Sequence, residues 1–484
     1  MKATKATQGT SAKPGPTHRD STLPPGQANR VLDRLLLLEQ VMTRADVLQV
    51  LRDTGCVDRR RCTMTFEVTC WLVLAMGLLA DLPLRQVFKA ARRLLPGDWD
   101  PHRSTLCKAR QRLGVAPVRL LFERLARPLA TPQTPGAFYR GLRLLALDGA
   151  VYNVPDSDAN AAAFGYPQGG RGAGAFPQVR KLSLVEVGTH AELAFAVKGL
   201  KEKDSAEQAM APGLFRHLGP GQLLVWDRGF FSYRLWQGLL LRSCQVLARV
   251  SARLVLRPVR ELADGSYLAN IYPCESFRNR GEGGLLVRVI RYTLADPQRV
   301  GHGQGHVLLT TLHDAAAHPA RDLILLYHER WEIELTIDEQ KTHQNPWRVT
   351  KPAQLRSETP LGVVQELYAL ALGHFVTRAL MAEAARGVGL DPDRLSFVGC
   401  LQVLRTRLPE FPPAPAAQPG WYQAFVAELA RERTEPRRNR VNPRVVRVKM
   451  SKFKKKRPEH RKIPPLERSF EGTIVVQQAG QHAA

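Results

Sequence analysis

Two apolar segments of this chain each run directly into an aspartate, and they constrain the fold more than any other feature. Residues 142–147 are apolar except for Arg143, and Asp148 follows them. Residues 223–226 are also apolar, and Asp227 follows. Continuous apolar runs of this length predict strands that are covered on both faces. A carboxylate is costly to bury there without a cation, so each aspartate indicates either a strand-terminal turn or a cation site.

The segments around these aspartates predict a mixed α/β sheet. Three strand-like segments are followed by a helix, a strand, a helix and a strand, all within residues 138–252. Residues 253–305 interrupt this alternation with short β-like pieces among Gly, Asp and Pro, which predicts an inserted β-rich lobe. Residues 306–350 then return to the sheet and enter a long helix from about Pro319 to Gln344.

Helical segments flank this core on both sides. Residues 29–130 have helical periodicity and are predicted to form a DNA-binding domain, and residues 351–433 are predicted to form a helical C-terminal region. Residues 1–28 are rich in Gly, Pro, Ser and Thr and are expected to be disordered, whereas residues 434–484 are expected to form a basic flexible tail.

The charge balance points to nucleic acid. The chain of 484 residues has 70 Lys and Arg against 44 Asp and Glu, a formal net charge of +26. Such an excess attracts polyanions, because each neutralised phosphate releases counterions. The densest basic block spans residues 437–462, where Glu459 is the one acid. A second basic stretch, with Lys108, Arg110 and Arg112, predicts either a helix against DNA or an ordinary solvated face.

Cysteine usage and hydropathy restrict the compartment. The seven cysteines include no Cys-x-x-Cys pair, so a zinc ribbon has no support. The chain starts without an apolar leader, and its most apolar stretch, about residues 68–80, is too short to span a bilayer and is expected to be a buried helix. These features predict a cytoplasmic, nucleoid-associated protein without a membrane partner.

The sharpest motif lies on the long helix. Tyr327, Arg330, Glu334 and Lys341 are spaced so that, at about 100° per residue, they fall within roughly 60° of one another. One stripe thus presents a hydroxyl, a guanidinium, a carboxylate and an ammonium group. The alternative interpretation of this stripe is a solvated charged face.

The same helix carries other acids that have to be weighed against Glu334. Asp338 lies near the stripe, one turn beyond Glu334, and is a rival to it, whereas Glu329, Glu332 and Glu339 point elsewhere. Three carboxylates can hold two cations about 4 Å apart for phosphoryl transfer. Nearby Arg, Lys and Tyr side chains can grip phosphates and align the strand.

These residues resemble the insertion-sequence 4 family of DDE transposases. That family is marked by Tyr, two residues, Arg, three residues, Glu, six residues and Lys, which Tyr327, Arg330, Glu334 and Lys341 match. The block LDGAVYNVPDSDANAAAFG resembles the segment around the first aspartate of the family, and WDRGFF the segment around its second. The block LRSETPLGVVQELYALAL resembles the segment after the glutamate helix, and the similarity extends from about residue 56 to residue 397.

The resemblance implies a ribonuclease H-like catalytic core with a β-rich insertion between the second Asp and the Glu. It also implies that Asp148, Asp227 and Glu334 bind two Mg²⁺ ions, for which Mn²⁺ can substitute. Tyr327 and Arg330, with Lys341, would contact phosphates near the transposon end. Family members cut and paste an element by hydrolysis and strand transfer, and they act as dimers on paired ends. The implied partners are double-stranded DNA with terminal inverted repeats, target DNA and a second copy of the chain.

Two questions stay open at this point. Trp226, Trp236 and Trp331 are candidates for stacking an extruded base, although a core role is the more common use of tryptophan. The alternative functions are a catalytically silent DNA-binding protein derived from a transposase and a related nuclease without strand transfer.

Overall fold

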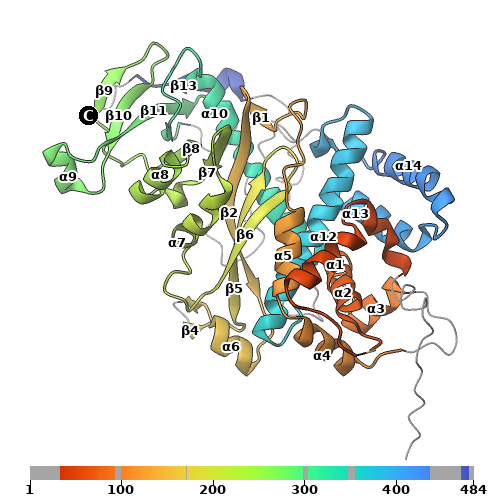
Figure 1. The fold of residues 1–484 in the computed structure, drawn as a ribbon. Coiled ribbons are helices and arrows are strands. Elements are labelled where there is room, and N and C mark those ends of the chain that lie inside the picture. The colour runs from red at the N-terminus through yellow and green to blue at the C-terminus, as the bar shows by residue number, and fades with distance from the viewer. Residues whose placement is uncertain are drawn as a thin grey trace, which may run out of the picture.

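A computed structural model describes residues 33–60, 62–92, 100–169, 172–297, 303–346, 355–435 and 470–478. The N-terminal segment 1–28, expected to be disordered, and the basic block 437–462 lie outside these residues. One large twisted sheet runs through the molecule, with helices on both of its faces and a helical body beside it (Figure 1).

The centre of the sheet has the mixed topology of a ribonuclease H-like core. Its five strands are β2 (Leu142–Asn153), β5 (Gln178–Glu186), β6 (Glu192–Gly199), β7 (Gln222–Trp226) and β8 (Gln245–Val250). They are arranged in the order β6-β5-β2-β7-β8. β5 is antiparallel to both β2 and β6, whereas β7 is parallel to β2 and β8 is parallel to β7. The two parallel pairs need crossover connections, and these contain the helices that cover one face.

The segment predicted as an inserted lobe continues this sheet. β12 (His306–Thr310) pairs with β8, and β11 (Leu285–Leu294), β10 (Tyr267–Ile271) and β9 (Pro258–Glu261) follow in order. α9 (Glu275–Arg280) connects β10 to β11, and β13 (Ile474–Val476), from the far end of the chain, pairs with β11. Strand 474–476 thus lies within the range predicted as a flexible tail. Three short strands complete the set: β1 (Phe138–Tyr139), which pairs with β2, and β3 (Gln168–Gly169) with β4 (Gly172–Ala173).

Helices cover the two faces of the sheet, and the alternation of side chains assigns each strand residue to one face. On one face, α7 (Glu207–Met210), the 3₁₀ segment Ala211–His217 and α8 (Tyr233–Leu240) pack on a cluster that includes Leu145 and Leu147. On the other face, α10 (Ala320–His328) and α11 (Glu332–Asp338) pack on a cluster with Leu144 and Ala146. The first face is therefore the side of α7, and the second is the side of α11.

The N-terminal and C-terminal helical segments share one apolar core. Their members are the 3₁₀ helix Asp33–Gln40, α1 (Arg44–Asp53), α2 (Phe66–Leu78), α3 (Leu84–Ala91), α4 (Arg103–Leu113), α5 (Ala116–Leu125), α12 (Pro360–Gly387), α13 (Phe397–Arg407) and α14 (Gln418–Leu429). Figure 1 shows them gathered around α12 beside the sheet. A further short helix, α6 (Asp158–Phe164), follows β2.

The helices α2 and α12 cross with their backbones in contact. A Cβ atom at Gly77 would lie 1.8 Å from the carbonyl oxygen of Ala369, so only glycine permits this approach. Gln344 fixes the crossing, since its Nε2 donates to the carbonyls of Gly77 (2.8 Å) and Leu370 (2.9 Å). α2 carries the apolar stretch expected to be a buried helix, and 11 of its 13 residues are buried. Within the described ranges no helix combines the length and apolarity needed to cross a membrane.

Candidate active site

Asp148 and Asp227 are neighbours on adjacent parallel strands. Leu147 pairs with Trp226 in the β2–β7 register, so the aspartate that follows each of them lies at the same level of the sheet. Neighbouring strands are about 4.8 Å apart. Each carboxylate accepts a hydrogen bond from the next backbone amide, at 2.8 Å from Gly149 and 2.6 Å from Arg228. Because side chains alternate along a strand, both aspartates face the side of α11.

Glu334 comes from a helical segment that is less regular than the sequence predicts. The expected uninterrupted helix from Pro319 to Gln344 begins at Ala320 and contains a 3₁₀ turn (Glu329–Trp331) and a π-helical segment (Glu339–Gln344). The spacing argument at about 100° per residue therefore does not hold along its whole length. Tyr327, Arg330 and Glu334 nevertheless lie close together across the 3₁₀ turn.

Arg330 lies among all three predicted carboxylates. Its Nη2 is 3.1 Å from Oε1 of Glu334, and its guanidinium carbon is 6.0 Å from the centre of the Tyr327 ring. Burial by itself lowers the pKa of Arg330, but the net shift is upward, because its electrostatic interactions with Tyr327, Asp227, Glu334 and Asp148 outweigh that effect. One guanidinium therefore lies within electrostatic reach of both aspartates and the helix glutamate. In the described residues, however, the ligand atoms of these three acids do not all lie within 4.8 Å of one another. Asp148 also lies inside β2, which continues to Asn153, and not in a strand-terminal turn.

The surroundings of Asp148 disfavour its charged form. Burial raises its pKa to about 6, and the carboxylates of Glu207 and Glu334 add to the effect. The Gly149 amide and Arg330 oppose the shift without cancelling it. This carboxylate group is thus short of positive charge, and its oxygen donors are those that hard divalent cations prefer. The donor set fits Mg²⁺ or Mn²⁺.

Tyr327 and Lys341, the other two members of the motif, have different surroundings. Tyr327 is buried, and burial raises its pKa to about 12, so it presents a neutral hydroxyl. The ammonium nitrogen of Lys341 lies 5.7 Å from the centre of the Tyr152 ring, four residues along β2 from Asp148. Burial lowers the pKa of Lys341. The structure thus brings Tyr327 to the carboxylates and places Lys341 beside a more distant part of the same strand.

The rival acid Asp338 has another partner. Its carboxylate is 3.2 Å from Nε2 of His343, and both side chains are nearly half exposed. Glu329 is half-buried, whereas Glu332 and Glu339 are buried away from the aspartates. The geometry therefore favours Glu334 over Asp338 as the third carboxylate.

A buried ionic cluster lies on the opposite side of the same helical segment, and the sequence analysis did not find it. Its members are His190, Glu332, Glu339, His374, Arg378 and Asp393. Each is less than 5% exposed. Glu332 and Glu339 are seven residues apart and therefore share a helix face, which was the one available signal.

His190 is the centre of this buried ionic cluster. It sits with a positive φ of 57° in the turn between β5 and β6. Its Nε2 is 3.0 Å from Glu332 and 3.4 Å from Asp393, and its Nδ1 is 3.1 Å from Glu339. Burial and Arg378 lower the pKa of His190, but the three carboxylates raise it to about 9. Among the described residues, His190, Glu332 and Asp393 are the group whose ligand atoms all lie within 4.8 Å of one another. Protein cations already balance most of its negative charge.

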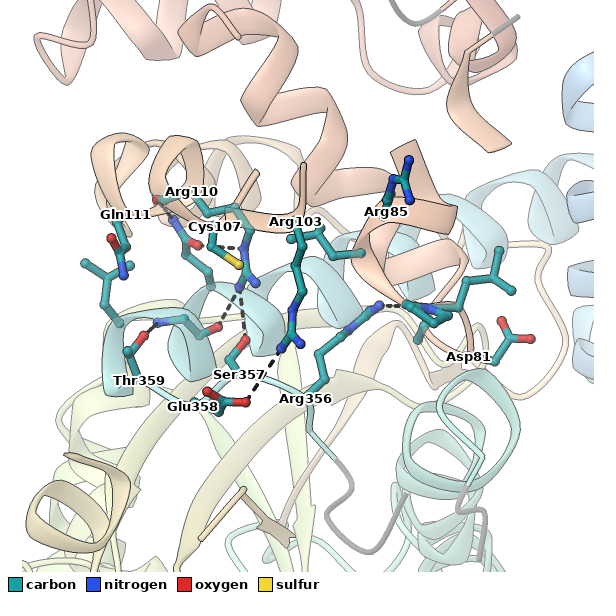
Figure 2. A pocket seen from close by; sticks show the side chains of 17 residues that line it. Asp81, Arg85, Arg103, Cys107, Arg110, Gln111, Arg356, Ser357, Glu358 and Thr359 are labelled. Carbon is teal, nitrogen blue, oxygen red and sulfur yellow. Dashed lines mark hydrogen bonds and ion pairs between the residues drawn. The ribbon is translucent and has the colours of Figure 1, made fainter. Parts of the chain in front are cut away.

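A cavity of about 600 Å³ lies between α4 and the start of α12, lined by none of the three site carboxylates (Figure 2). The basic side chains of its wall are paired with protein groups. Arg110 donates to Oγ of Ser357 (3.1 Å) and to the carbonyl of Gly362 (3.0 Å), and Arg103 is 3.6 Å from Glu358. The prediction for the basic stretch of α4 is thus wrong for Arg110, which is a buried structural residue. Lys108 and Arg112 are exposed.

The tryptophans that were weighed for base stacking are core residues where the structure describes them. Trp226 and Trp236 are both 0% exposed in the core on the side of α7. The Trp331 side chain lies outside the described residues.

Comparison with known proteins agrees with this geometry. Residues 32–123 match the family model "Insertion element 4 transposase N-terminal", and residues 139–374 match "Transposase DDE domain". The chain is 30% identical over 419 residues to the transposase InsG for insertion sequence element IS4 of Escherichia coli strain K12, covering 84% of this chain and 90% of that protein.

Two further matches are more distant. The putative transposase InsZ of the same bacterium is 26% identical over 193 residues, which is 39% of this chain and 61% of that protein. A piggyBac transposase synaptic complex with hairpin DNA aligns with a TM-score of 0.41 at 14% identity, covering 85% of this chain and 88% of that chain. The matched domains and the InsG similarity establish the identity: the chain belongs to the insertion-sequence 4 family of DDE transposases, enzymes that cleave DNA and transfer its strands.

Proposed function

We propose that this transposase cuts at terminal inverted repeats and joins the freed ends to target DNA, with Asp148, Asp227 and Glu334 as the ligands of two divalent ions. The observation that carries the proposal is the position of Arg330. Its guanidinium is within electrostatic reach of all three carboxylates, two of which lie at the same level of adjacent parallel strands, Asp148 inside β2 and Asp227 directly after β7. In the absence of metal it provides positive charge to this group of acids.

Bound Mg²⁺, or Mn²⁺ in its place, would supply Lewis-acid activation of the attacking and leaving oxygens. The protein's own groups would orient the DNA. Arg330 has the planar fork that binds phosphate oxygens in pairs, and it lies beside the carboxylates. The neutral hydroxyl of Tyr327 can donate one hydrogen bond to a phosphate oxygen, and Lys341 supplies a charge farther along β2.

DNA binding over a larger surface is supported by the formal charge of +26 and by exposed basic residues. Lys108 and Arg112 are exposed on α4, within the matched N-terminal family segment, which supports a DNA-binding role for residues 29–130. We extend the proposal to a homodimer that holds two transposon ends together, because excision and insertion of an element require both ends to be cut and joined.

The experiment is cleavage and joining of a labelled inverted-repeat duplex taken from the ends that flank the gene. With Mg²⁺ and a supercoiled target plasmid, we expect nicking at the end of the repeat, followed by labelled joint product. Nicking without joint product would indicate a nuclease that does not transfer strands. Sequence-specific binding with no nicking in Mg²⁺ or Mn²⁺ would show a catalytically silent DNA-binding protein and contradict the proposal.

A further inference from the structure

Arg249 on β8 faces the same side of the sheet as Asp148 and Asp227, on the strand next to Asp227. We infer that Arg249 binds a backbone phosphate of the DNA strand that is cut, next to the phosphate that reacts. The inference rests on the proposed function, because it adds a phosphate contact beside the proposed metal site. It is carried by the position of Arg249, by the neutral groups around it and by the lack of a protein partner within the described ranges.

The strand register places Arg249 in one row with the two aspartates. Trp226 on β7 pairs with Leu147 on β2 and with Ala248 on β8. The residues that follow these three are Asp148, Asp227 and Arg249. Because the three paired residues belong to the core on the side of α7, the residue after each of them faces the side of α11. Leu308, which pairs with Arg249 from β12, belongs to the core on that second side. Arg249 is thus one strand, about 4.8 Å, from Asp227 and two strands from Asp148.

The aromatic side chains near Arg249 are uncharged. Burial raises the pKa of Tyr327 to about 12, and nearby charges, Arg249 among them, also act on this hydroxyl group. Burial lowers the pKa of His306 to about 4, and the positive charge of Arg249 adds to this effect. Burial also raises the pKa of Tyr292, and Arg249 opposes that shift. All three groups are neutral at pH 7, so none of them neutralises the guanidinium.

The Arg249 side chain makes no hydrogen bond or ion pair with any residue that the structure describes, Asp227 on the neighbouring strand included. It is nevertheless half-buried, unlike a freely solvated arginine. Arginines that stabilise this fold are instead bonded to several protein groups, as are Arg110, Arg288, Arg356 and Arg378. An unpaired guanidinium beside a proposed cation site suits an anion that binds together with the metal. The phosphates of DNA are such anions, and the planar fork of arginine can donate to two phosphate oxygens.

Binding of the full-length protein to inverted-repeat duplexes with single methylphosphonates tests the inference. Each duplex has one charged phosphate near the cleavage site replaced by an uncharged group, and Ca²⁺, which also prefers oxygen ligands, takes the place of Mg²⁺. For the wild type, we expect loss of the contacted phosphate to weaken binding about tenfold, as for one charge-assisted hydrogen bond. Arg249→Gln should bind the unmodified duplex about tenfold more weakly and lose nothing further with that methylphosphonate.

The matched control is Arg291→Gln, which removes the same charge from the opposite face of the sheet. Arg291 is half-buried on β11 and pairs with Val307 of the core on the side of α7. Its Nε donates to the hydroxyl oxygen of Tyr267, at 3.0 Å. In this variant the methylphosphonate should still weaken binding about tenfold, because the contact to the phosphate is intact.

The outcomes separate this inference from the proposed function. If every methylphosphonate near the cleavage site weakens binding of Arg249→Gln as much as binding of the wild type, the inference is overturned, while nicking of the repeat by the wild type leaves the proposed function standing. If the wild type neither prefers the repeat to a scrambled duplex nor nicks it, the proposed function fails and the inference falls with it.

Thermal unfolding verifies that each variant is folded. Should Arg249→Gln fail to fold, Arg249→Lys keeps the positive charge but loses the planar fork. The effect of the same methylphosphonate should then shrink to about threefold, because a single ammonium group makes a weaker contact than the fork. An undiminished effect in Arg249→Lys would overturn the inference.

Discussion

One helical segment, residues 332–341, carries two groups of acids with opposite surroundings. Glu334 lies near Asp148 and Asp227, where Arg330 supplies positive charge and the Glu334 side chain is 41% exposed. Glu332 and Glu339 face the buried ionic cluster, where His190 and Arg378 supply positive charge and nothing is open to solvent. Acids that look alike in the sequence therefore differ in what neutralises them. Cationic side chains of the protein neutralise the second group, whereas we propose that the first group binds divalent cations.

The two groups are also mechanically related. The buried ionic cluster ties the helical segment to the β5–β6 turn, to α12 and to the residues before α13. Gln344, at the end of the π-helical segment, ties it to the crossing of α2 and α12. We infer that the buried ionic cluster holds residues 332–341 in place, so that Glu334 keeps its position relative to Asp148 and Asp227.

The largest effect on DNA cleavage is expected when one of the three site carboxylates is removed. Asp148→Ala, Asp227→Ala and Glu334→Ala should each lower cleavage of an inverted-repeat duplex in Mg²⁺ by about a thousandfold, since the metal supplies several kcal/mol of transition-state stabilisation. Asp338→Ala, with its carboxylate paired to His343, should cut within a few fold of the wild type. Full activity of Glu334→Ala together with loss in Asp338→Ala would reassign the third ligand.

Substitution in the buried ionic cluster should lower the free energy of unfolding. Arg378→Met leaves the carboxylate of Glu339 and its neighbours with less positive charge in a dry site, so the free energy of unfolding should fall by about 3–5 kcal/mol. The measurement is denaturant unfolding. Arg386→Met, an exposed change two turns along the same helix, is the control and should cost less than about 0.5 kcal/mol. Equal stability of the two variants would mean that the cluster does not stabilise the fold.

The affinity of the site for metal should depend on pH through the carboxyl group of Asp148. The raised pKa of Asp148, about 6, means that below this pH the folded, metal-free protein holds a proton on the carboxyl group. The proton must leave for a cation to bind, so the apparent Mn²⁺ affinity should fall by about tenfold per pH unit below pH 6 and level off above it. Titrations at pH 5, 6 and 7 check this. An affinity that does not change between pH 5 and pH 7 would contradict the assignment of Asp148.

The smallest effect is expected for Lys341, which lies beside Tyr152, farther along β2 than Asp148. Lys341→Ala should weaken DNA binding about equally for all sequences and lower the salt dependence of the binding constant by about one unit, as expected for the loss of one phosphate contact. Binding isotherms at several salt concentrations provide the slope. An unchanged slope with reduced cleavage would place Lys341 in positioning rather than in phosphate binding.

The features that sequence could predict are local ones. The apolar runs before Asp148 and Asp227 predicted strands, and the spacing of Tyr327, Arg330 and Glu334 predicted one face of a helix. Each depends on a period within one element. The family resemblance added the ribonuclease H-like core, and the mixed topology of the central strands agrees with it.

The features that sequence could not predict depend on pairing across long distances. His190 and Arg378 are 188 residues apart, and nothing in their flanking residues indicates that they meet. Glu207 packs against Gly149, where a Cβ atom would lie 2.2 Å from its Oε1, and the residues that flank Glu207 do not indicate this contact. Composition predicted β-structure in residues 253–305 but not that its strands continue the central sheet, because strand composition does not specify a partner. The 3₁₀ and π-helical breaks lie at Glu329–Trp331 and Glu339–Gln344, where the helical periodicity predicted one regular helix.

The most direct test of the central claim is anomalous diffraction from crystals of the full-length protein grown with Mn²⁺. The account predicts anomalous density among Asp148, Asp227 and Glu334, with Arg330 moved away from Glu334. Density at His190, Glu332 and Asp393 instead, with none beside Asp148 and Asp227, would contradict it.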